Sequence, residues 1–209
     1  MNNISYVTKK ETKPYKTEFN QLFQKIKQYF VDDFSLTYQL VGSSKRNLVI
    51  SHHNKGFDLD YQIIIQKIKN QEKWKNPNKI KDKFFKFIQN QLQQKYTIEN
   101  STSAITLKKL DTINSKIKVG FDIVILKEIN NNYEILKRSI NDNYNFQKMT
   151  EHKDFRNNFR KIKDKQLWNE LRKKYLENKI KIIKENSDEK SYFTLIKTVK
   201  TIIDNLDKY

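Results

Sequence analysis

The feature that most limits the fold of this chain is a pair of apolar segments that each contain aspartate. FDLDYQIIIQ (residues 57–66) and KIKVGFDIVILK (residues 116–127) have the length and residue types of β-strands. Within them, Asp58, Asp60 and Asp122 interrupt the apolar pattern. Because an isolated carboxylate is costly to bury in such a strand, we expect a chemical role for these three side chains.

Strand geometry indicates what that role is. Residues two apart point to the same side of a strand, so Asp58 and Asp60 project together, whereas Leu59 and Tyr61 face the opposite layer. Two such carboxylates repel each other unless a cation lies between them, and Mg²⁺ or Mn²⁺ with oxygen ligands is the simplest solution. If the strand of Asp122 lies beside them, the third carboxylate completes a two-ion site that can activate an attacking oxygen.

A candidate phosphate-binding segment precedes the first of these strands. Residues 36–41 have the pattern of a short strand, which Gly42-Ser43 ends. Glycine permits a phosphate to approach the backbone closely, and the serine hydroxyl can bind it. Lys45 and Arg46 follow directly and are candidates for neutralising a triphosphate.

Two helices are predicted in the first 140 residues. The first covers residues 15–31 behind Pro14, and the second begins at Pro77 with Asn76 as its N-cap. The expected core positions of the first helix are Phe19, Leu22, Phe23, Ile26 and Phe30.

The remaining pattern predicts an α+β fold with a mixed sheet flanked by helices. Residues 103–110 and 116–127 form the two halves of an antiparallel hairpin, and residues 133–137 add an edge strand. Beyond Asn141 the periodicity becomes helical throughout. We therefore expect a catalytic core over residues 1–140 and a C-terminal helical region over residues 141–209.

Charge and composition limit the kinds of partner and site that we expect for this chain. The formal net charge is +18, which favours binding of nucleotides and nucleic acid; a proteome rich in Lys, Asn and Ile would produce the same surplus without any polyanion. The absence of cysteine excludes disulfides, thiolate metal sites and a cysteine nucleophile. No segment has the pattern of a signal peptide or a membrane span, so we expect a cytoplasmic protein without a membrane partner.

Together these segments resemble the active-site pattern of the nucleotidyltransferase superfamily, whose fold is that of DNA polymerase beta. VGSSKRNLVISHHNKGFDLDYQIII followed by VGFDIVIL places a strand ending in Gly-Ser, a strand with Asp-x-Asp and a later strand with a third acid in the order that the superfamily uses. SAITLKKL before VGFDIVIL is similar to the hairpin of template-independent members such as oligoadenylate and cyclic-oligonucleotide synthases. The resemblance covers about residues 15–140.

The resemblance implies two Mg²⁺ ions bound by Asp58, Asp60 and Asp122, and an NTP whose phosphates meet Gly42 and Ser43. The favoured function is transfer of a nucleotide, from ATP by preference, to an acceptor hydroxyl on RNA, with release of pyrophosphate. Synthesis of cyclic or linear oligonucleotides ranks second and transfer to a protein third. The non-enzyme alternative is a basic nucleic-acid-binding protein. In a plain basic α+β domain, Asp58 and Asp60 would instead pair with lysines of residues 67–86. The oligomeric state stays open.

Overall fold

The computed structural model describes residues 4–52, 55–149, 153–185, 187, 189 and 191–206. The chain divides into two compact units, one spanning Val7–Met149 and the other combining Met1–Tyr6 with Thr150–Tyr209. Within the described residues, no helix has the length and apolarity needed to cross a membrane.

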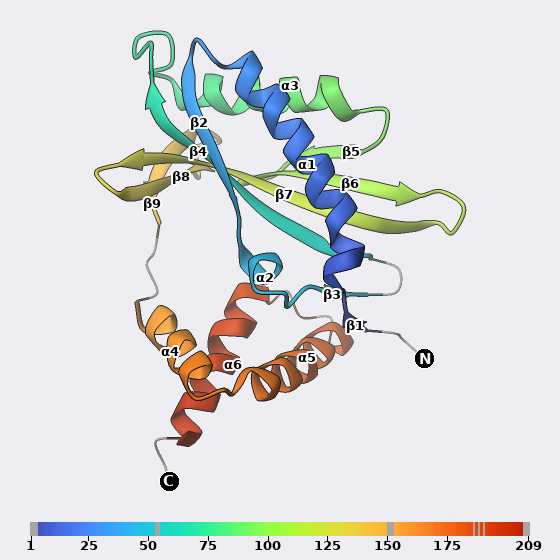
Figure 1. Ribbon diagram of the computed structural model, residues 1–209. Helices are drawn as coiled ribbons and strands as arrows, with labels where there is room; N and C mark the ends of the chain where they lie inside the picture. Colours follow the sequence, from blue (N-terminus) through green and yellow to red (C-terminus); the bar gives the residue numbers. More distant parts are fainter. Residues whose placement is uncertain are drawn as a thin grey trace. The chain divides into compact units, whose positions relative to one another are not determined.

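The larger unit is built on a seven-stranded sheet in the order β2-β4-β7-β6-β5, with β8 beside β7 and β9 beside β8. Helices α1 and α3 cover one face of this sheet (Figure 1). The elements of this unit are α1 (Lys9–Tyr29), β2 (Phe34–Leu40), α2 (Gly42–Lys45), β3 (Ile50–Ser51), β4 (Asp58–Ile68), α3 (Pro77–Leu92), β5 (Thr97–Asn100), β6 (Ala104–Asp111), β7 (Lys116–Ile129), β8 (Asn132–Arg138) and β9 (Tyr144–Lys148). The predicted α+β class with a mixed sheet is confirmed.

One pair of strands in this sheet is parallel, and that pair carries the aspartates. Strands β4 and β7 run in the same direction, whereas β2–β4, β5–β6, β6–β7, β7–β8 and β8–β9 are antiparallel. Parallel neighbours cannot be joined by a tight turn, and the chain between β4 and β7 accordingly passes through α3, β5 and β6. This crossover brings two segments far apart in sequence into contact.

Helix α1 begins earlier than predicted. It starts at Lys9 rather than Tyr15, and Pro14 lies inside it. The sequence signal that was missed is a capping box: the Thr8 side chain accepts a hydrogen bond from the Glu11 backbone N–H, and the Glu11 carboxylate accepts one from the Thr8 N–H. The predicted core positions are confirmed, because Phe19, Leu22, Phe23, Ile26 and Phe30 are all buried.

Two predictions near the end of this unit need correction, although the strand predicted over residues 133–137 is present as β8. The segment beyond Asn141 is not helical throughout, because residues 144–148 form β9. Strand β8 is therefore not an edge strand, since it lies between β7 and β9. Tertiary contacts account for the difference: the Tyr144 N–H donates to Asn78 Oδ1 at the start of α3, and the Tyr144 hydroxyl hydrogen-bonds Asn100 Oδ1.

The smaller unit is helical apart from β1 (Ser5–Tyr6). Its helices are α4 (Lys153–Asp164), α5 (Trp168–Lys184) and α6 (Ser191–Leu206). The Tyr6 hydroxyl donates to the Arg172 carbonyl oxygen at 2.7 Å, and the Arg172 guanidinium lies 3.8 Å from the Tyr6 ring centroid. The apolar stripes of α5 and α6 are buried, with Leu171, Tyr175, Leu195, Val199, Ile202 and Ile203 in the core.

Candidate active site

The three predicted carboxylates lie on one face of two adjoining strands. In the β4–β7 register, Asp60 is directly opposite Asp122, and Asp58 is opposite Gly120. Leu59 and its neighbours on the other face of β4 are buried beneath the helices. The structure therefore brings Asp58, Asp60 and Asp122 together through the parallel pairing, as strand alternation requires.

The position of Asp60 in this group disfavours its ionised form. Burial, followed by repulsion from the carboxylates of Asp122 and Asp58, raises the pKa of Asp60 to about 7. Among the described side chains, no three carboxylate or imidazole groups are gathered tightly enough to form a ready-made metal site. Oxygen ligands that repel one another are nevertheless the donor set that suits a hard divalent cation, because such an ion offsets the repulsion.

Gly42 lies directly against the second of these carboxylates. Its φ is +63°, and a Cβ added there would be 2.3 Å from Asp60 Oδ2. Both facts require glycine at this position. The Val41 N–H donates to the Asp60 carbonyl oxygen at 2.9 Å, and the Asp60 N–H donates to Ser44 Oγ at 3.4 Å, so the start of α2 is anchored to β4.

The other residues of the predicted phosphate-binding segment are placed less directly. The Ser43 carbonyl oxygen accepts from the backbone N–H groups of Arg46 and Leu48, which closes the short helix. The Arg46 Nη1 group donates to the Gly42 carbonyl oxygen at 3.0 Å, and Lys45 is exposed. Roles for Ser43, Lys45 and Arg46 at a triphosphate therefore stay predictions.

Three residues on the carboxylate face were not predicted from the sequence. Thr106 lies opposite Asp122 on β6, and its hydroxyl donates to Asp122 Oδ1 at 2.6 Å. Gly120 makes room for Asp58, because a Cβ there would be 2.2 Å from Asp58 Oδ1. Lys108 lies opposite Gly120 and is bound by the carboxylate of Glu99.

A sequence signal existed for one of these residues. A glycine within an apolar strand often marks a close approach of another group, which applies to Gly120. The position of Thr106 opposite Asp122 depends on the hairpin register, which only the structure shows.

Comparisons with known proteins bear on the fold. No family model matches the sequence, and no curated protein matches it. A solved structure of Elizabethkingia meningoseptica CdnE cyclic dinucleotide synthase with GTP and Apcpp is similar to 88% of this chain and 67% of its own, with a TM-score of 0.57 and 12% identity. The chain has the nucleotidyltransferase fold.

A second structure agrees, that of E. coli MS115-1 CdnC with ATP, which has a TM-score of 0.55 and 14% identity over 96% of this chain and 62% of that one. Vibrio cholerae DncV cyclic AMP-GMP synthase is matched over 38% of its length, so this chain spans well under half of that synthase. At these sequence identities the structural similarity establishes the fold of this chain, and not its activity or substrates. The expectation of an RNA acceptor gains no support from these neighbours.

Proposed function

We propose that this chain is a metal-dependent nucleotidyltransferase that joins nucleoside triphosphates into a cyclic or linear oligonucleotide. The observation that carries the proposal is the cross-strand pair of Asp60 and Asp122 with Gly42 against the Asp60 carboxylate. The similarity to a cyclic dinucleotide synthase favours this product over nucleotide transfer to RNA, which ranks second.

Asp58, Asp60 and Asp122 would hold Mg²⁺ or Mn²⁺ between them. The ions would supply charge neutralisation at the phosphates and at the attacking and leaving oxygens. The raised pKa of Asp60 supports this assignment, because a carboxylate that repels two others is stabilised as an anion when a cation is present.

The residues of the chain account for the transfer in the following way. A ribose hydroxyl oxygen of one nucleotide attacks the α-phosphorus of another, and the hydroxyl proton passes to a carboxylate oxygen of Asp122. The bond between the α-phosphorus and the bridging oxygen breaks, and pyrophosphate leaves. Gly42 lies against the Asp60 carboxylate, and the Ser43 hydroxyl and the charges of Lys45 and Arg46 next to it would bind the triphosphate.

The test is to incubate the purified protein with Mn²⁺ or Mg²⁺ and each α-labelled NTP, with and without total RNA, and to separate the products by size. We expect labelled products smaller than RNA that form equally well without it. Label that enters RNA instead would favour the RNA acceptor. No transfer under any condition would overturn the proposed activity, and no Mn²⁺ binding by calorimetry would overturn the metal site as well.

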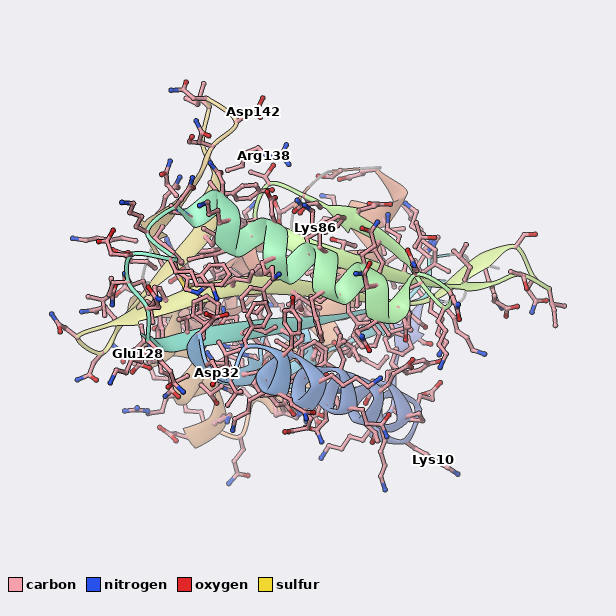
Figure 2. All side chains as sticks on the ribbon, turned by 90° about the horizontal axis from the view of Figure 1, so that it is seen from above. Lys10, Asp32, Lys86, Glu128, Arg138 and Asp142 are labelled. Carbon is pink, nitrogen blue, oxygen red and sulfur yellow. The ribbon has the colours of Figure 1, made fainter. Side chains whose placement is uncertain are left out.

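A matched pair of variants links this activity to the site. Asp122→Asn removes one charge from the carboxylate group, and we expect product formation to fall by at least about 10²-fold. Asp32→Asn makes the same chemical change at an exposed position between α1 and β2, labelled in Figure 2, and should leave the rate unchanged. Equal activity of the two variants would exclude Asp122 from the reaction.

A further inference from the structure

We propose that Thr106 is a positioning residue that sets the orientation of the Asp122 carboxylate; this rests on the proposed function. Thr106 lies directly opposite Asp122 in the β6–β7 register. Its hydroxyl donates to Asp122 Oδ1 at 2.6 Å, and the pair is partly buried. A hydroxyl-to-carboxylate bond of this length is at the strong end of the range for side chains.

The position of β7 between its neighbours explains why this contact matters. The sheet order places β4 on one side of β7 and β6 on the other. Asp122 therefore has the Asp60 carboxylate across one strand boundary and the Thr106 hydroxyl across the other. Repulsion by the Asp60 carboxylate and attraction to the Thr106 hydroxyl act in the same direction, so both favour one oxygen of Asp122 lying toward β6.

A threonine on a strand is well suited to this task. Its β-branched side chain has few rotamers, so the hydroxyl is held in place before any ligand binds. Because the Thr106 hydroxyl takes one lone pair of Oδ1, we expect Oδ2 to meet a cation or the proton of an attacking hydroxyl. The other polar side chain nearby on β6, Lys108, is bound by Glu99 and lies opposite Gly120 rather than Asp122.

Two substitutions distinguish the role of the Thr106 hydroxyl group from that of the side-chain shape. Thr106→Val keeps the volume and the branching but removes the donor, whereas Thr106→Ser keeps the donor. Losses of about 10- to 100-fold in metal affinity or activity are typical when a side chain that orients a metal ligand is removed.

The experiment measures Mn²⁺ affinity by calorimetry and steady-state oligonucleotide synthesis for the wild type and for three variants. We expect Thr106→Val to weaken Mn²⁺ binding about 10-fold and to lower kcat about 10- to 100-fold, with KM for NTP within about 2-fold. Thr106→Ser should stay within about 3-fold of the wild type in both measurements. Thr97→Val, at an exposed position on β5, is the matched control and should change neither.

Each result bears on the proposal. Wild-type affinity and turnover in Thr106→Val would overturn it, as would a Thr106→Ser protein as impaired as Thr106→Val, because the hydroxyl would then be irrelevant. A wild type that binds Mn²⁺ but transfers no nucleotide would refute the proposed function alone, and the Mn²⁺ affinities would still decide the role of Thr106. A wild type that binds no Mn²⁺ would overturn both. Circular dichroism of each variant identifies any loss that comes from unfolding.

Discussion

The two faces of strand β4 differ sharply although they are made from alternate residues of one segment. Leu59, Tyr61 and Ile63 point into the core and are almost fully buried, whereas Asp58 and Asp60 point to the opposite face. The first face is mainly apolar and is shielded from solvent. On the second face, burial and then repulsion from neighbouring carboxylates raise the pKa of Asp60. One strand therefore supplies both a core face and a face of neighbouring carboxylates, because the side-chain period of a strand is two.

The apolar face owes its stability to the helices above it. The Phe19 ring of α1 stacks on the Tyr61 ring with a centroid distance of 3.4 Å, and Phe30 stacks on Phe84 of α3 at 4.3 Å. The outer surfaces of these helices are polar, and Figure 2 shows Lys10 and Lys86 on them. Changes on this face should therefore alter folding, and changes on the carboxylate face should alter activity.

The largest expected effect is on the apolar face. Phe19→Ala removes a ring that is 1% exposed and stacked on Tyr61, which creates a cavity beneath α1. We expect the free energy of unfolding of the larger unit to fall by about 3–5 kcal/mol. Urea denaturation followed by fluorescence measures this change. A loss below about 1 kcal/mol would mean that α1 does not cover a packed core.

Asp60→Asn tests the opposite face of the same strand. We expect nucleotide transfer to fall by at least about 10²-fold, because a ligand charge is lost. The metal-free protein should be no less stable at pH 8, since removal of one charge relieves the repulsion by Asp122 and Asp58. A destabilised Asp60→Asn protein would contradict the expectation that repulsion between these carboxylates destabilises the metal-free protein. Asp32→Asn serves as the control.

The pH dependence of stability sharpens the same contrast. The pKa of Asp60 is about 7 in the folded protein and about 4 in an unfolded chain, so the folded state binds the proton more tightly. The metal-free protein should therefore lose stability as the pH rises from about 4 to about 7 through this group, and Asp60→Asn should show a smaller loss. Addition of Mn²⁺ at pH 8 should raise the melting temperature of the wild type more than that of Asp60→Asn.

Gly120→Ala should have a smaller effect, confined to the carboxylate face. The added Cβ would meet Asp58 Oδ1 at 2.2 Å, so the Asp58 carboxylate must move. We expect activity to fall by about 10-fold, with a change in the free energy of unfolding of about 1 kcal/mol or less. Unchanged kinetics would show that the position of Asp58 is not critical.

The smallest expected effect is at the start of α1. Thr8→Ala removes the N-cap hydroxyl, whose oxygen accepts a hydrogen bond from the Glu11 N–H. Stability should fall by about 1 kcal/mol in thermal or urea unfolding, without any effect on Mn²⁺ affinity. An effect on Mn²⁺ affinity would show that the two faces are coupled.

Much of the fold was predictable from local pattern. The α3 cap is one example, because Asn76 accepts from the Asn78 N–H and Pro77 occupies the first helical position, as the sequence indicated. The β6–β7 hairpin is another. The strand β9 was missed because its conformation depends on contacts with Asn78 and Asn100, which lie far away in the sequence.

For the candidate site, the sequence by itself determined that Asp58 and Asp60 share a face, because alternation is a property of a single strand. It could not determine that β7 lies parallel to β4 with Asp122 opposite Asp60, because strand pairing is a long-range choice made when the whole sheet packs. The contacts of Gly42, Gly120 and Thr106 with these carboxylates were decided in the same step, since each joins two segments that only the folded sheet brings together.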